Sequence, residues 1–385
     1  MTAFRCSAPG RVNLIGEHTD YTGGFVMPVA VQFATTARIS SAADGMYRFA
    51  SDQFDTIRVM APEDRSPRKG EWSDYPVGVL REFQELGICP SPFDLTVNGN
   101  VPLGAGLSSS ASIEVATAMA LLAYCGKSMG PGEIARLCQR AENRYVGSPC
   151  GIMDQSIAVS ALAGKALLLN TRDLSFELLP LDRGNLAESR IVVANSGVKH
   201  SIAGGDYGLR RREVEAGQAI VRQRFPQLRD LGDATLEQLE QCRSEMSVES
   251  FKRCRHIITE NARVARAKAA MLAGDPVQLG TVLTAAHASE RDDFECSVEE
   301  VDFLVATAAQ LDGCYGARLT GGGFGGCTVN LVSAGKAEAF GAALKEAYRQ
   351  RYQLEAEIYV CEAVDGAIAR NLAIMTSAEK GIATC

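Results

Sequence analysis

The pattern of apolar positions divides the chain into a first part in which strands and helices alternate and a later part that is mostly helical. Apolar and β-branched runs predict strands, whereas apolar residues that recur every three or four positions predict helices. The elements expected in the first part are a β-rich segment at 25–40, a helix at 74–86, a strand at 93–98, a helix that opens in the serine-rich loop near 108–110, a helix at 131–145 and a hairpin at 165–170 and 176–181.

A new unit is expected from about residue 190 onward. Its elements are a strand at 190–195, a nearly continuous helical stretch at 207–311, strands at 314–319 and 327–332, a helix at 335–351 and a strand at 355–361. Within the helical stretch, Thr235 and Gln238 have the spacing of a capping box, in which side chains bond the free N–H groups of a helix start. The order of elements predicts an α+β protein with two lobes, residues 1–180 and 181–385.

A charged segment near the N-terminus is the first candidate for chemistry. Residues 8–24 read APGRVNLIGEHTDYTGG and place Arg11, Glu17, His18 and Asp20 around an apolar run. Because an unpaired buried ion is costly, the pattern favours a strand that delivers a polar cluster into a cleft. Carboxylate acceptors gathered on one short loop suit a ligand rich in hydroxyl donors, such as a sugar. A charged loop after an edge strand is the structural alternative.

A glycine- and serine-rich turn is the second candidate. Residues 101–112 read VPLGAGLSSSAS and lead into an apolar helix. Small residues let backbone N–H groups approach a ligand, and a helix N-terminus favours phosphate. No lysine follows the glycines, so the loop is not a Walker A motif. An ordinary capping turn remains the alternative. The residues of the candidate phosphate loop are Gly104, Ala105, Gly106, Leu107, Ser108, Ser109 and Ser110.

A second glycine-rich loop is the third candidate for chemistry. Residues 318–332, RLTGGGFGGCTVNLV, place glycines between two β-rich stretches, which permits close packing against a loop or a ligand.

The net charge of −7 over 385 residues argues against a nucleic-acid partner. We find no apolar run near the roughly 18 residues of a membrane span. The N-terminus lacks a signal-peptide core, so a cytoplasmic location is expected.

These three segments, in this order, resemble the signature motifs of the GHMP kinase superfamily. The first, GRVNLIGEHTDY, resembles the galactokinase signature, and the segments at 141–155, 195–215 and 285–305 are also similar to galactokinase segments in matching order. The resemblance implies a two-lobed GHMP-kinase-like α+β fold with the active site in the cleft between lobes. It also implies transfer of the γ-phosphoryl group of MgATP to O1 of α-D-galactose, giving galactose 1-phosphate and ADP. Galactose and ATP are the implied partners, and a monomer is expected more than an oligomer.

The resemblance also assigns roles to residues. Asp154 matches the catalytic aspartate that orients or deprotonates the sugar hydroxyl, and Arg11 matches the arginine beside it. Ser110 and Glu142 match the ligands of Mg²⁺. The positions that match sugar contacts are Glu17, His18, Thr19, Asp20 and Tyr207, and those that match nucleotide contacts are Ser51 and the loop from Gly104 to Ser110. From the residues alone, Asp154 could be a helix N-cap and Glu142 an exposed helix residue. Trp72 lies either near the adenine or in the core.

Two departures and three rival interpretations stand beside this assignment. Thr22 and Gly197 replace asparagines that are common in the family, close to sugar-binding segments, which leaves fine selectivity open. A non-haem iron site could use His18 and Asp20 with a distant histidine as third ligand, either His200 or His287. A non-catalytic sugar sensor on the same fold is the second rival. An N-acetylgalactosamine or arabinose kinase is the third.

Overall fold

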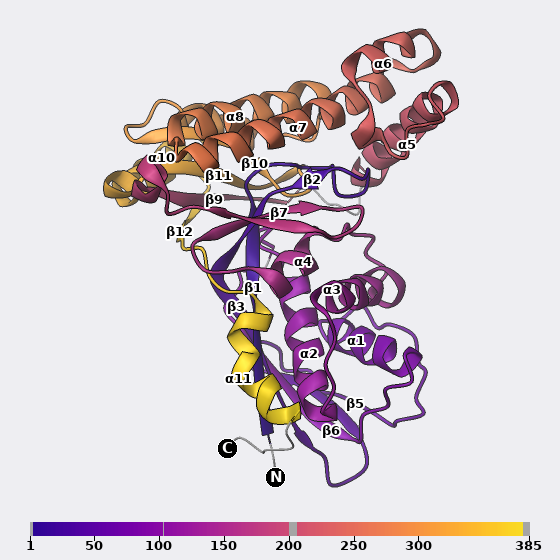
Figure 1. The fold of residues 1–385 in the computed structure, drawn as a ribbon. Helices are drawn as coiled ribbons and strands as arrows, with labels where there is room; N and C mark the ends of the chain where they lie inside the picture. The colour runs from indigo at the N-terminus through magenta and orange to yellow at the C-terminus, as the bar shows by residue number, and fades with distance from the viewer. Residues whose placement is uncertain (1–2, 103, 200–205, 380–385) are drawn as a thin grey trace.

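Two groups of elements, the lower and upper halves of Figure 1, meet along a shared hydrophobic seam. The structure is a computed structural model that describes residues 3–102, 104–199 and 206–379. The lower half is built on a five-stranded sheet, and a helix that is buried almost all round packs on it. A helix that is apolar on every side needs such a fully buried place.

The strands of the lower sheet lie in the order β1-β3-β6-β4-β5, and among the described strands of this sheet only β4 and β6 pair in parallel. Their bounds are β1 Ala3–Asn13, β3 Pro28–Ser41, β4 Tyr47–Ser51, β5 Arg58–Met60 and β6 Phe93–Gly99. The helices of this half are α1 Asp74–Glu85, the buried α2 Ser109–Cys125, α3 Pro131–Arg140, the π-helix η1 Ala141–Val146 and α4 Met153–Ser160. The C-terminal helix α11 (Ala367–Glu379) returns to pack on β1 and α2 (Figure 1).

The upper half has a four-stranded antiparallel sheet in the order β10-β11-β9-β12. Its strands are β9 Ser189–Lys199, β10 Cys314–Thr320, β11 Gly325–Ser333 and β12 Glu357–Cys361. The helices are α5 Asp206–Arg224, α6 Leu236–Gln241, α7 Val248–Ala273, α8 Pro276–Ser289, α9 Glu299–Ala308 and α10 Ala337–Tyr352, with the π-helix η6 at Glu290–Phe294. Short 3₁₀ turns are η2 Gly184–Glu188, η4 Leu231–Asp233, η5 Arg243–Glu245 and η7 Ala334–Lys336.

Helix α8 lies directly on the upper sheet because Gly280 has no side chain at the point of contact. A Cβ on Gly280 would sit 2.0 Å from the carbonyl oxygen of Tyr315, so only glycine allows this close approach to β10. The N-terminus of the helix is capped by Asp275, whose side chain accepts hydrogen bonds from the N–H groups of Val277 and Gln278. Pro276 follows at the first helical position, where its missing N–H costs no hydrogen bond.

A third, small sheet of β2 Phe25–Val26, β7 Lys165–Asn170 and β8 Phe176–Pro180 lies between the halves (Figure 1). The seam itself is a buried apolar cluster with contributions from both sides, among them Val12, Leu14, Leu107, Val193, Leu283 and Leu331. The loops that carry the candidate chemistry leave the strands at this seam.

The expected α+β class and most of the expected elements are confirmed, including the 165–181 hairpin and the Thr235–Gln238 capping box. The helix expected at 131–145 is wrong in one respect, because the chain changes to π-helical winding at Ala141. Strands β4 and β5 and helix α11 were not anticipated. Where the lobes divide stays a prediction. Within the described ranges no helix is both long and apolar enough to cross a bilayer.

Candidate active site

The end of strand β1 meets the serine-rich loop at the seam. The backbone N–H of Arg11 donates to the carbonyl oxygen of Leu107 at 3.0 Å. A Cβ on Gly10 would lie 2.5 Å from that same oxygen, so the glycine permits the contact. The pairing of β1 with β3 shifts register between Pro9 and Arg11. Such irregularities bend a strand and re-aim a side chain, here the guanidinium of Arg11.

Arg11 and Asp154 form a two-pronged ion pair at this point. Nε and Nη2 of Arg11 donate to Oδ1 and Oδ2 of Asp154 at 2.7 and 2.6 Å, and Nη1 donates to the carbonyl oxygen of Gly106 at 2.5 Å. The hydroxyl of Ser108 donates to Oδ2 of Asp154, also at 2.5 Å. A carboxylate has about four acceptor directions, so these bonds leave roughly one of them for a further donor. The Asp154 side chain is 22% exposed and therefore reachable.

A cavity of about 640 Å³ opens beside this pair, between the serine-rich loop and the glycine-rich loop that joins β10 to β11. Its lining includes Arg11 and Asp154, the loop residues Gly104 and Gly106–Ser110, and Thr320–Gly326. Both loops thus line one cavity. Two of their non-glycine residues, Ser108 (φ 59°) and Phe324 (φ 58°), have left-handed backbone conformations. Such strained residues cluster where surrounding structure fixes a functional geometry.

Several of the sugar-binding candidates lie close to Asp154 and the loops that line this cavity. Burial, with help from the negative charges of Asp154 and Glu17, raises the pKa of Asp20 to about 7. A Cβ on Gly151 would meet Oδ2 of Asp20 at 1.5 Å, so the turn before Asp154 lies directly against that carboxylate. Tyr207 comes within ordinary contact distance of a Cβ placed on Gly322. Asp154, Asp20 and Tyr207 therefore converge from three separate segments.

His18 is a neutral, buried imidazole with one open nitrogen. Burial lowers its pKa well below the usual range, as do the charges of His256 and Arg318. Its ring stacks on Phe294 at 3.9 Å, and Nδ1 lies 3.3 Å from the hydroxyl of Tyr21. Nε2 is buried and has no partner among the described residues. A buried unpaired nitrogen is costly, so this atom is suited to a hydrogen bond with a ligand.

Two of the sugar-site candidates are held firmly by the protein itself. Oε1 of Glu17 accepts from the Gly321 N–H at 2.8 Å and from the Thr320 hydroxyl at 3.1 Å, which ties the segment to the glycine-rich loop. Thr19 is fully buried, and its hydroxyl donates to the carbonyl oxygens of Gly16 and Phe25 at 2.8 and 2.7 Å. These contacts shape the loop that presents His18 and Asp20.

The structure also shows the surroundings of Thr22 and Gly197, the two departures from the family pattern. Thr22 is buried, and its hydroxyl donates to the carbonyl oxygen of Thr19 at 3.0 Å. Gly197 has φ 71°, a backbone conformation that glycine and asparagine both tolerate.

Glu142 lies in the π-helix and is 5% exposed, so it is not the exposed helix residue that its sequence context allows. Burial raises its pKa to about 7; hydrogen bonds from Cys150 and Ser110 lower it, while the charge of Asp154 raises it. The side-chain N–H₂ of Gln155 donates to Glu142 at 2.8 Å and to the fully buried Glu114 at 3.2 Å. Neither Gln155 nor Glu114 was anticipated from the sequence, because only the fold brings them to Glu142.

The donor set of Glu142 and Ser110 fits Mg²⁺, which prefers a few oxygen ligands and completes its shell with water and phosphate. In the part of the chain that the structure describes, no group of three or more His, Cys, Asp or Glu side chains is arranged to hold a metal. His287 is buried, with its ring nitrogens near Asp302 and the Leu319 N–H. It does not join His18 and Asp20 in an iron site, and His200 lies outside the described residues.

Weakening this donor set should raise the magnesium requirement. Ser110→Ala or Glu142→Gln is expected to raise the Mg²⁺ concentration for half-maximal activity several-fold, because each removes an oxygen ligand or its charge from a site with few protein ligands. The check is a magnesium titration at fixed ATP, with Glu85→Gln on the exposed end of α1 as control. Titration curves that match the wild type in both variants would place the metal elsewhere.

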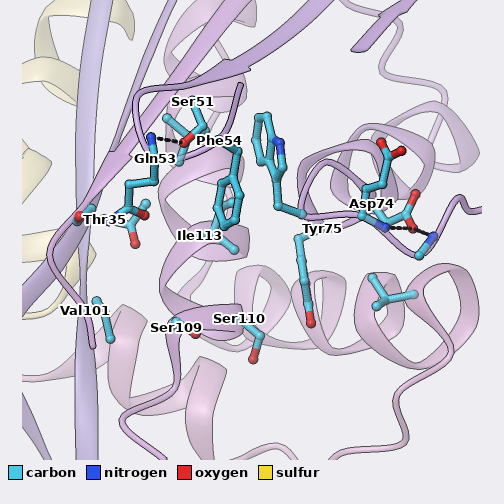
Figure 2. A pocket seen from close by; sticks show the side chains of 16 residues that line it. Thr35, Ser51, Gln53, Phe54, Asp74, Tyr75, Val101, Ser109, Ser110 and Ile113 are labelled. Carbon is cyan, nitrogen blue, oxygen red and sulfur yellow. Dashed lines mark hydrogen bonds between the residues drawn. The ribbon is translucent and has the colours of Figure 1, made fainter. Parts of the chain in front are cut away.

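A second cavity, of about 420 Å³, continues from the serine-rich loop and shares Ser109 and Ser110 with the first. Figure 2 shows its walls, with Ser51, Gln53 and Phe54 on one side and Asp74 and Tyr75 on the other. Trp72 also lines it and stacks on Phe54 with ring centroids 5.9 Å apart. Ser51 and Trp72, the expected adenine neighbours, thus lie in one cavity adjoining the candidate phosphate loop.

Comparison with known proteins gives a consistent result. The model of the galactokinase galactose-binding signature matches residues 2–41, that of the GHMP kinase N-terminal domain residues 74–161, and that of the GHMP kinase C-terminal domain residues 267–350. A galactokinase of Roseiflexus sp. (strain RS-1) is 42% identical over 93% of this chain and 91% of its own length. The galactokinase of Homo sapiens is 40% identical over 94% of this chain and 91% of its own.

Comparison with solved structures shows the same fold. The crystal structure of Lactococcus lactis galactokinase complexed with galactose superimposes with a TM-score of 0.90 and 30% identity, covering 94% of each chain. Mevalonate kinase of Methanococcus jannaschii shares the fold, with a TM-score of 0.67 at 16% identity over 94% of this chain and 98% of that one.

Proposed function

This chain belongs to the galactokinase family of the GHMP kinases, and from that membership we propose how its own residues carry out the reaction. The protein is an ATP-dependent kinase that phosphorylates galactose. We assign Asp154 and Arg11 as the catalytic residues and O1 of the sugar as the acceptor atom. The phosphoryl group is transferred in the cavity between the serine-rich loop and the glycine-rich loop.

The observation that carries this assignment is the Arg11–Asp154–Ser108 cluster beside the larger cavity. Phosphoryl transfer depends mainly on positioning and on neutralising charge at the transferring group. The remaining acceptor direction of Asp154 takes the O1 hydroxyl, orients it and accepts its proton as transfer proceeds. Arg11 keeps the carboxylate in place and faces the negative charge that develops on the phosphoryl oxygens.

ATP lies across both cavities in this proposal. The triphosphate follows the N–H groups of Gly104–Ser110 at the start of α2, where the helix dipole favours anions. The base occupies the smaller cavity beside Ser51 and Trp72. Mg²⁺, held by Ser110 and Glu142, supplies charge neutralisation at the phosphates when bound.

Galactose is placed by Asp20, His18, Glu17 and Tyr207, while Thr19 supports the loop. The open Nε2 of His18 and the carboxylate of Asp20 supply the polar atoms that distinguish hydroxyl orientation. We also propose, from the sequence alone, that the protein acts in the cytoplasm, most readily as a monomer, without nucleic-acid or membrane partners. Phosphorylation of N-acetylgalactosamine or arabinose by the same site is the alternative for substrate choice.

The test of this proposal is identification of the product. Purified protein with MgATP and galactose should form ADP and galactose 1-phosphate in equal amounts, with the phosphate on the anomeric oxygen by phosphorus–proton coupling in NMR spectra. Parallel reactions with N-acetylgalactosamine and arabinose measure the alternative. A phosphate on another hydroxyl would overturn the O1 assignment, and faster turnover of the N-acetyl sugar would overturn the choice of substrate.

A further inference from the structure

A carboxylate at the start of helix α1 fixes one wall of the smaller cavity. Oδ2 of Asp74 accepts hydrogen bonds from the backbone N–H groups of Lys69, Gly70 and Glu71 at 3.0, 2.6 and 3.2 Å, and Oδ1 also receives the Lys69 N–H at 3.0 Å. Figure 2 shows Asp74 beside this turn at the edge of the cavity. Three successive N–H groups are therefore gathered on one side chain, which sets the path of the 69–71 turn.

The same carboxylate is paired with a buried arginine. Nη1 of Arg58 on β5 donates to Oδ1 of Asp74 at 2.7 Å, and both side chains are 2% exposed. Nη2 of Arg58 donates to the hydroxyl of Tyr145 at 3.0 Å. Tyr145 belongs to the π-helix and follows Glu142 by three positions. Arg58 thus connects the turn beside the cavity to the segment that carries a proposed magnesium ligand.

The residue that follows this turn is the aromatic wall of the cavity. Trp72 stacks against Phe54 with an interplanar angle of 9°, and its indole N–H donates to the hydroxyl of Thr56 at 3.1 Å. Two residues after Trp72, the chain enters α1 at Asp74. The position of the Trp72 ring therefore depends on the turn that Asp74 holds.

A purely structural reason for the buried pair is weak. Burying two charges costs desolvation that their attraction often fails to repay, so such a pair is poor evidence of stabilisation. A fixed geometry that several backbone and side-chain groups share is a better account of it.

We propose that Asp74 and Arg58 are positioning residues for the nucleotide. They hold the 69–72 segment, and with it Trp72, in the place that receives the base, and through Tyr145 they align that place with the segment of Glu142. This inference rests on the proposed placement of ATP across the two cavities.

The test compares Asp74→Asn, Asp74→Ala and Tyr145→Phe with Asp94→Asn, a matched control that removes a half-exposed aspartate–arginine pair from the same sheet. Asp74→Ala should raise the KM for ATP roughly tenfold or more, because a misplaced wall weakens the contacts that position the base. The KM for galactose should stay within about twofold. Asp74→Asn, which keeps one acceptor oxygen, and Tyr145→Phe should show smaller rises of the same kind.

A second readout does not require turnover. Trp72 is the only tryptophan, so its fluorescence reports nucleotide binding directly. The wild type should change emission on ADP addition, and the Asp74 variants should need more ADP for half the change. A residue that served folding alone would lower the melting temperature and the active fraction, and so reduce kcat without moving the KM for ATP. That pattern in Asp74→Asn and Tyr145→Phe would overturn the positioning role.

Failure of the ATP placement is distinguishable from failure of this inference. Trp72→Leu should itself raise the KM for ATP. An unchanged KM in Trp72→Leu would mean that the base lies elsewhere, which overturns both statements. A raised KM in Trp72→Leu with unchanged values in all Asp74 and Tyr145 variants would overturn the positioning role alone.

Discussion

Asp154→Asn should lower kcat by roughly 10²–10⁴-fold, the usual contribution of a positioned general base. The amide has nearly the same shape, but it lacks the negative charge that orients and deprotonates O1. One side of the amide carries N–H₂ and cannot accept a hydrogen bond, so at least one of the bonds from Arg11 and Ser108 is also lost. Galactose and nucleotide affinity should remain within about an order of magnitude, because uniform binding is separate from transition-state stabilisation.

The measurement pairs steady-state kinetics with binding of ADP by Trp72 fluorescence and of galactose by calorimetry. Asp312→Asn, at a side chain that is 82% exposed, serves as the control. Near-normal turnover in Asp154→Asn would remove Asp154 from the chemistry. A large loss of both affinities instead would mean that the residue serves to bind the substrates.

Arg11→Lys should be severely impaired although it keeps the positive charge. Arg11 uses three nitrogens at once, two toward Asp154 and one toward Gly106. An ammonium group is a compact point charge and cannot reproduce that planar fork. The expected loss in kcat is on the order of 10² or more, similar to removal of one charge-stabilising donor.

Arg5→Lys provides the matched control, since Arg5 lies on the same strand with an exposed side chain. Both variants are compared by kcat and by the KM values for galactose and ATP. If Arg11→Lys keeps most of the wild-type turnover, Arg11 acts only as a general counter-charge and its geometry is unimportant.

The placement of candidate site residues followed from the sequence where those residues lie within one motif, while their roles stay predictions. The charged segment around Glu17 and His18 is buried at the seam as expected, and the serine-rich loop faces the larger cavity. These features follow from local composition, because many polar groups beside an apolar run must be placed in a protected site.

Features that depend on tertiary contacts were missed. Ser108 has the local preference of a helix cap, yet it adopts a left-handed conformation and bonds Asp154, which is distant in sequence. Asp74 reads simply as a first-turn residue of a helix; its bonds to Arg58 and to the 69–71 turn exist only once β5 and α1 are adjacent. The change to π-helical winding at Ala141 leaves the apolar pattern of a helix intact, so periodicity does not reveal it.

The central claim, a site built for galactose, is tested most directly by the ratio of kcat/KM for galactose to that for glucose. The two sugars differ only in the orientation of the C4 hydroxyl. A site whose polar atoms are placed for one orientation leaves them unpaired with the other, which amounts to roughly 10⁴-fold discrimination. The account predicts a ratio of about that size, measured as ADP formation under identical MgATP conditions. Comparable values for the two sugars would contradict it.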